Sequence, residues 1–142
     1  MTQPVRLRLS RARGFDLQSH SRAVNGLPAI AVVRPSLLGN PFVVGVDGNR
    51  AECVFLEAAV LGGYTALGKS ASVEAQIAHR NHVAAVRESY RMHNVACWCV
   101  LPIAKQDDVC HAVTLIDVFN APPRLTKFIG PTSPATDDGR VS

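Results

Sequence analysis

The sequence predicts a small single-domain α/β fold, a mixed sheet flanked by three helices. Its 142 residues, 47% of them apolar, suit one hydrophobic core. Strand-like segments lie near the start of the chain and again near residue 95, with helix-like segments between and after them. This order is typical of helices that cover a sheet. We place the domain at residues 1–120, and we expect a polar, disordered tail at 121–142, which is rich in Pro, Gly, Thr and Asp.

In the first third of the chain we predict three short strands. Residues 5–9 alternate apolar and arginine side chains, which indicates a strand with one exposed face. Residues 10–28 are predicted to form a loop. Residues 30–33 are continuously apolar, as in a buried strand, and Pro35 ends that strand because it cannot donate to a ladder. Residues 42–46 are predicted as a third short strand.

Three helices and one more strand follow. A helix at 51–61 is predicted from Asn49, which can cap it in a capping box. Because that segment is apolar nearly all round, we expect it to be buried. A second helix is predicted at 73–90, a buried strand at 95–100, and a last helix at 108–119.

The positive charge is concentrated at the N-terminal end. The net charge is +4, and residues 1–34 contain one acid, Asp16, against arginines at 6, 8, 11, 13, 22 and 34. The guanidinium fork suits phosphate, so this segment is either a solvated basic face or an anion-binding surface. Nucleic acid stays open as a partner of this segment, although no aromatic residues alternate with the arginines.

The chain shows no apolar run of the roughly 18 residues that span a membrane, and residues 1–10 lack the apolar core of a signal peptide. We therefore expect a cytoplasmic protein with no membrane partner. Its four cysteines are then expected to be reduced thiols. The sequence leaves the oligomeric state open.

A first candidate site follows the buried strand at 30–33. Arg34 is placed to hold an anion, Ser36 and Asn40 to position it by hydrogen bonds, and Gly39 to allow close backbone approach. The alternative is a rigid turn in which Asn40 bonds its own backbone.

A second candidate site combines Cys97, Cys99, Cys110 and His111. Three thiols and an imidazole form a Cys₃His zinc set, although an extended Cys-x-Cys must bend to chelate. The alternative is that the thiols at 97 and 99 pack in the core.

Cys110 and His111 also form a candidate catalytic pair at the start of the last helix. A helix N-terminus lowers a thiol pKa, so Cys110 is a candidate nucleophile with His111 as its base. The alternative is a buried thiol beside a histidine that only caps the helix. His79 and His82, three residues apart, are predicted to lie on the surface.

Several of these motifs occur together in a way that resembles a family of small uncharacterised phage and bacterial proteins. The motifs are Val5–Arg11 with Gly14, the Arg34-Pro-Ser-x-x-Gly-Asn-Pro-Phe42 run, Asp47-Gly48 with Arg50, Ala96-Cys-Trp-Cys99, and Cys110-His-Ala112 with Leu115. The resemblance covers most of residues 4–120. It implies a domain of unknown function, often carried by phages. Val113 stands where the resemblance leads us to expect an aspartate; if that aspartate serves catalysis, its loss favours binding without turnover.

Both candidate sites are predicted to share one cleft, because the carboxyl ends of parallel neighbouring strands lie at one edge of a sheet. The leading hypothesis is a protein that binds or processes a phosphorylated small molecule, a nucleotide or nucleotide-derived ligand, through Arg34, Ser36, Gly39, Asn40 and Arg11. The alternatives are a zinc-stabilised nucleic-acid-binding module and a ligand-free interaction or inhibitor protein. No cofactor is expected, and whether the protein is an enzyme stays open.

Overall fold

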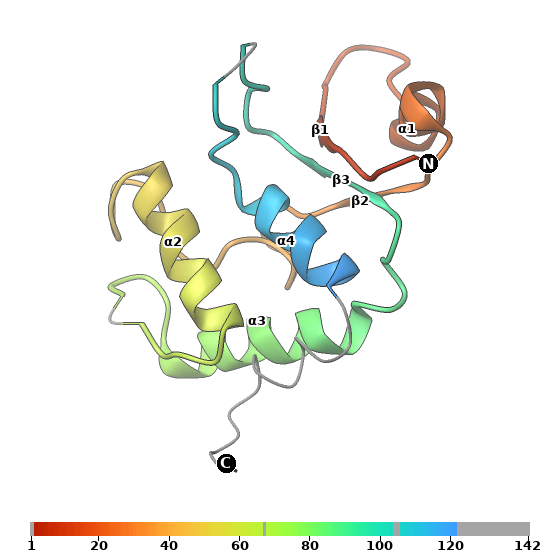
Figure 1. Cartoon of the computed structure of the whole chain (residues 1–142). Coiled ribbons are helices and arrows are strands. Elements are labelled where there is room, and N and C mark those ends of the chain that lie inside the picture. The colour runs from red at the N-terminus through yellow and green to blue at the C-terminus, as the bar shows by residue number, and fades with distance from the viewer. Residues whose placement is uncertain (1, 67, 104–105, 122–142) are drawn as a thin grey trace.

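The computed structural model describes residues 2–66, 68–103 and 106–121 (Figure 1). Within these ranges no helix is long and apolar enough to cross a membrane. The tail predicted at 121–142 lies, apart from Ala121, outside the described residues. The elements in chain order are β1 (Arg6–Arg8), α1 (Leu17–Asn25), β2 (Ala29–Ala31), α2 (Arg50–Leu61), α3 (Val73–Val86), β3 (Asn94–Cys97) and α4 (His111–Asn120).

The three described strands form a parallel sheet in the order β1-β3-β2. Leu7 pairs with Ala96, and Ile30 pairs with Val95. The predicted α/β class is confirmed, with a sheet that is parallel throughout rather than mixed. We call the end of the sheet where residues 32–34 and 98–99 follow the strands the carboxyl edge. The opposite end, where Val5, Pro28 and Asn94 lie, is the amino edge.

Helix α1 corrects the prediction of a loop at 10–28. The carboxylate of Asp16 caps this helix by accepting a hydrogen bond from the Ser19 N–H at 2.8 Å, and Gly26 ends it with a φ of 81°. Its buried position is a serine, Ser21, whose hydroxyl donates to the Leu27 carbonyl. The prediction was wrong because this helix buries a polar residue and has only three apolar residues, Leu17, Ala23 and Val24, among its nine.

The strand predicted at 42–46 is also wrong. The described part of this segment forms only one isolated bridge, between Val44 and Gly48. The Asp47 carboxylate accepts hydrogen bonds from the Val43 N–H and from the Ser70 hydroxyl, and so folds the segment into a turn. Val44 and Val46 are consequently exposed instead of packed in a sheet.

Helices α2 and α3 confirm two of the predicted helices. Asn49 and Glu52 form the capping box of α2, and Ser72 caps α3. The expectation that α2 is buried all round is wrong, since Phe55 is 71% exposed. The helix buries one face instead, and that face includes the charged residue Glu57.

The main core lies between the sheet and helices α3 and α4. It is built around Val32, Val83, Val95, Leu115 and Phe119, each at most 1% exposed. Because Cys97 and Cys110 belong to the same cluster, the packing of α4 against β3 brings the first turn of α4 to the carboxyl edge. The core thus determines which polar groups meet there.

Candidate functional site

A cavity of about 360 Å³ lies at the carboxyl edge of the sheet. It is lined by the segment after β2, the segment after β3, helix α2 and the start of α4. The lining residues are Val33, Arg34, Asn40, Phe42, Val44, Arg50, Cys53, Val54, Cys97, Trp98, Cys99, Cys110 and His111. The two candidate sites of the sequence therefore meet in one cavity, because β2 and β3 are parallel neighbours.

Within the segment 34–42, the structure separates lining residues from residues that shape the chain. Arg34 and Asn40 line the cavity, but the Asn40 side chain also donates to the Cys53 carbonyl at 3.1 Å and accepts from the Phe42 N–H at 2.9 Å. The Ser36 hydroxyl accepts from the Leu38 N–H, outside the lining. A Cβ on Gly39 would lie 2.6 Å from the backbone nitrogen of Arg34. The glycine is therefore needed for the close approach of two segments of the chain, and not for the approach of a ligand.

The cations of the cavity are two arginines on different segments. Arg34 follows β2 and Arg50 begins α2, and both are exposed. Among the described residues, the lining contains no carboxylate and neither arginine forms an ion pair. The lining is therefore suited to an anion.

Trp98 joins this cavity to the basic N-terminal segment. The indole is 42% exposed and lines the cavity. The Arg11 guanidinium lies 4.4 Å from the centroid of the ring, a cation–π distance. Arg11, predicted as a ligand-binding residue, lies outside the lining and touches the cavity only through Trp98.

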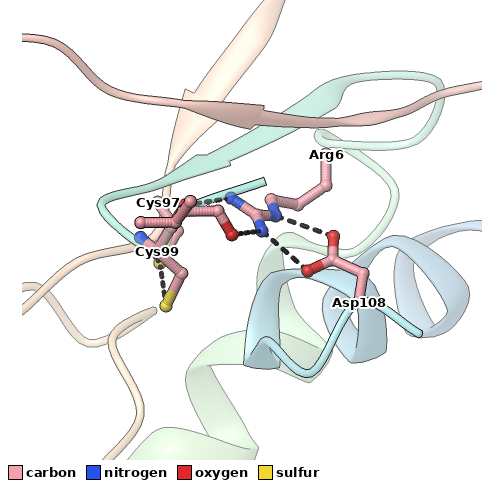
Figure 2. A network of polar contacts seen from close by, with 5 residues as sticks. Arg6, Cys97, Cys99 and Asp108 are labelled. Atoms are coloured by element: carbon pink, nitrogen blue, oxygen red, sulfur yellow. Dashed lines mark hydrogen bonds and ion pairs between the residues drawn. The ribbon is translucent and has the colours of Figure 1, made fainter. Parts of the chain in front are cut away.

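Three cysteines bring their sulfur atoms together on one wall of the cavity. The Sγ atoms of Cys97, Cys99 and Cys110 all lie within 4.8 Å of one another. Those of Cys97 and Cys99 are 3.4 Å apart, and the Cys99 N–H donates to the Cys97 sulfur at 3.5 Å. The chain bends after β3, as chelation by a Cys-x-Cys pair requires. Figure 2 shows the Cys97 and Cys99 side chains at this bend.

The three thiols affect one another's ionisation. Hydrogen bonds from the Cys110 and Cys99 thiols lower the pKa of Cys97 strongly. The same contacts with Cys97 and Cys99, together with burial, raise the pKa of Cys110. The structure therefore favours a thiolate at Cys97, whereas the sequence pattern favoured one at Cys110. A catalytic role for Cys110 and His111 stays a prediction.

His111 is buried beside this cluster, in the first turn of α4. Its Nε2 lies 2.7 Å from the Val32 carbonyl, so this nitrogen donates. Burial lowers the pKa of His111, but contact with Cys97 and the nearby Glu57 outweigh burial and raise it. The ring thus connects the segment after β2 to the sulfur cluster.

Arg6 holds the cysteine-bearing segments in place and was not recognised from the sequence. The alternating pattern at 5–9 predicted that Arg6 is exposed, but it is 8% exposed. Its guanidinium donates to both carboxylate oxygens of Asp108, at 2.8 and 2.7 Å, and to the carbonyls of Cys99 and Val100 (Figure 2). One side chain of β1 therefore ties the bend after Cys97 to the residues just before Cys110.

A buried pair of residues, His79 and Glu57, joins helices α3 and α2. His79, predicted to be on the surface, is 2% exposed, and its Nε2 lies 2.9 Å from Oε2 of Glu57. The other ring nitrogen, Nδ1, donates to the Leu37 carbonyl at 2.7 Å. The surface prediction was wrong because the partner carboxylate lies on a different helix. This pair fixes the segment that carries Arg34 and Asn40 to helices α2 and α3.

The fold and the site define a small parallel α/β domain with a basic, thiol-lined cavity at the carboxyl edge of its sheet. A family model described as a domain of unknown function (DUF4326) matches residues 16–121, and the chain belongs to that family. The matched segment includes every residue that lines the cavity, whereas Arg6 precedes it. No curated protein and no solved structure was found to match the chain.

Proposed function

We propose that this protein binds a phosphorylated small molecule of the nucleotide class in the cavity at the carboxyl edge. The proposal rests on one observation: Arg34 and Arg50 both line a cavity in which no described lining residue carries a carboxylate. Arginine forks bind phosphate oxygens in bidentate geometry, which suits one ligand phosphate between two chain segments. Parallel α/β sheets also bind their ligands at this edge.

The remaining lining suits the rest of such a ligand. The volume of about 360 Å³ lies in the lower part of the usual range for small-molecule pockets. Trp98 offers an exposed aromatic surface for a base, and the apolar side chains of Phe42 and Val54 line the same cavity. The proposal keeps Cys110 and His111 as residues that reach the ligand and assigns them no reaction.

We further propose a cytoplasmic location, in the host cell if a phage encodes the protein. The free cysteines support this proposal: Cys53, Cys97, Cys99 and Cys110 form no disulfide among themselves. Three of them lie close together, where an oxidising compartment would promote bond formation.

Isothermal titration calorimetry with AMP and ADP tests the ligand proposal. We expect Arg34→Ala and Arg50→Ala each to weaken binding by about tenfold or more, since a charge-assisted hydrogen bond contributes roughly 1.5–3 kcal/mol. Arg13→Ala is the matched control, because Arg13 is exposed and lies outside the cavity lining. Equal affinities of the wild type and Arg34→Ala, or an equal loss in Arg13→Ala, contradict the proposal.

A further inference from the structure

The sulfur cluster leads to a proposal that does not depend on the nucleotide ligand. We propose that Cys97, Cys99 and Cys110 together bind one Zn²⁺ ion as thiolates, on the wall of the cavity. The chelating atoms come from two segments, the bend after β3 and the residue before α4.

The distances between the sulfurs fit a tetrahedral zinc site. With Zn–S bonds of about 2.3 Å, tetrahedral geometry places the sulfurs roughly 3.8 Å apart. The three sulfurs already lie within 4.8 Å of one another, and the Cys97–Cys99 pair is at 3.4 Å. Side-chain adjustments of well under an ångström per atom therefore convert the observed cluster into a zinc-binding one.

The surroundings stabilise negative charge on Cys97 and hold the cysteine-bearing segments in place. The Cys99 N–H donates to the Cys97 sulfur, as backbone amides do toward anionic acceptors. Arg6 fixes both segments at once, through the carbonyls of Cys99 and Val100 and the carboxylate of Asp108 (Figure 2). Such outer contacts orient ligands before the metal arrives.

Packing alone does not account for this arrangement. Cysteines that only fill a core have no need to face one another, and Cys53 lies in a different apolar cluster, with Phe42 and Val60. The other three converge where a cavity gives access from outside. Zinc prefers sulfur ligands; on binding it would displace the thiol protons and balance the charge of the three adjacent thiolates.

The fourth position of this zinc faces the cavity. His111 lies beside Cys97, and its Nε2 donates to the Val32 carbonyl, which leaves Nδ1 as the nitrogen able to bind a metal, but the histidine does not belong to the group of ligand atoms within 4.8 Å of one another. Water or a donor atom of a bound molecule then completes the coordination, as in zinc sites with three protein ligands. A zinc ion there would border the same cavity that Arg34 and Arg50 line.

Metal analysis and cobalt substitution of the full chain test the proposal. Protein purified under reducing conditions and loaded with Zn²⁺ is expected to retain about one ion per chain after desalting. Co²⁺ in its place should give sulfur-to-cobalt charge-transfer absorption and intense visible bands of a tetrahedral site. Cys97→Ser, Cys99→Ser and Cys110→Ser should each weaken metal affinity by more than about 100-fold, because each removes a direct ligand.

Cys53→Ser is the matched control, because Cys53 is buried and lines the same cavity without joining the cluster. It should retain the metal, as should Arg34→Ala. The two variants therefore allow the zinc proposal and the nucleotide proposal to be tested independently. His111→Ala should also retain it. Circular dichroism of each variant separates lost binding from lost folding. Where a variant unfolds, Co²⁺ titration of the wild-type apoprotein takes the place of the measurement on that variant. A wild-type protein without the cobalt–sulfur spectrum, or an equal loss of metal in Cys53→Ser, overturns the proposal.

Discussion

The polar groups at the two edges of the sheet differ in whether their hydrogen bonds and charges are paired within the protein. At the amino edge Asn94 is fully buried, and both ends of its side-chain amide are paired. Its oxygen accepts from the Val5 N–H and the Asn25 amide, and its nitrogen donates to the Ser21 hydroxyl and the Asn25 oxygen. These bonds connect β1, α1 and β3, so the polar groups of this edge serve the fold.

At the carboxyl edge the polar groups are held in place but left available. Arg6 uses its donors on Asp108 and two carbonyls, and so positions the cysteines without occupying the cavity. Arg34 and Arg50 line the cavity and form no ion pair among the described residues. Saturated polar groups thus indicate structure, whereas positioned and unpaired ones indicate a ligand site.

The largest effect is expected where the carboxyl edge depends on a buried charge. His79→Ala leaves the Glu57 carboxylate buried without its partner, which should reduce the free energy of unfolding by about 3–5 kcal/mol. Urea denaturation measures this. Glu57→Gln is the control: its amide can still bond His79, so a loss below about 1 kcal/mol is expected. Equal losses in the two variants contradict this account of the pair.

The next effect tests the amino edge. Asn94→Ala removes an amide that makes four hydrogen bonds and leaves its buried partners without one. This should reduce the free energy of unfolding by roughly 3 kcal/mol. The folded fraction should bind AMP and Zn²⁺ with unchanged affinity, because the site is at the other edge. Asn81→Ala, at an exposed position of α3, is the control and should change little. Loss of ligand affinity in Asn94→Ala contradicts the claim that the polar groups of the amino edge serve only the fold.

A smaller effect is expected from Arg6→Lys. Lysine keeps the charge but lacks the fork that reaches Asp108 and two carbonyls together. The free energy of unfolding should fall by about 1–2 kcal/mol, because Asp108 is partly exposed. Metal affinity should fall about 10–100-fold, as for other outer-shell changes. Arg8→Lys, at the exposed last residue of β1, is the comparison, and an equal change in both variants argues against the positioning role of Arg6.

The smallest effect concerns the turn at residues 43–48. Hydrogen bonds from the Ser70 hydroxyl and the Val43 N–H lower the pKa of Asp47 in the folded protein. A lowered folded pKa stabilises the protein above the unfolded value near 4, and this contribution is lost as pH falls through the folded pKa. Thermal melts of wild type and Asp47→Asn should therefore differ at pH 7 and converge in strong acid. A difference that is independent of pH rules out this origin.

The sequence was informative where local chemistry determines structure. The capping box that begins at Asn49 predicted the start of α2, and the predicted start of α3 at residue 73 is confirmed directly after its cap, Ser72. Pro35 and the apolar run before it predicted the end of β2 to within two residues. These features depend on residues that are close together in the chain, so they can be predicted from a single sequence.

Features that depend on distant partners were not predictable. Arg6 is buried because it pairs with Asp108, which is 102 positions away in the sequence. Glu57 is buried because it pairs with His79, which lies on another helix. Helix α1 was missed although Asp16 and Gly26 are good cap residues, since its buried position is Ser21. For the site, the sequence identified Arg34, Asn40, Cys97, Cys99, Cys110 and His111, all of which line the cavity. Arg50 and Arg6 appeared within the motifs of the resemblance, and the sequence predicted no place in the cavity for either.

Amide chemical-shift mapping with AMP tests the contrast between the two edges most directly. In ¹H–¹⁵N spectra of the labelled protein, saturating AMP should shift the signals of Arg34, Arg50, Cys99, His111 and the Trp98 indole. The signals of Asn94, Asn25 and Ser21 at the amino edge should stay in place. Shifts confined to the basic segment of Arg8, Arg11 and Arg13, or spread equally over both edges, would contradict a ligand site at the carboxyl edge.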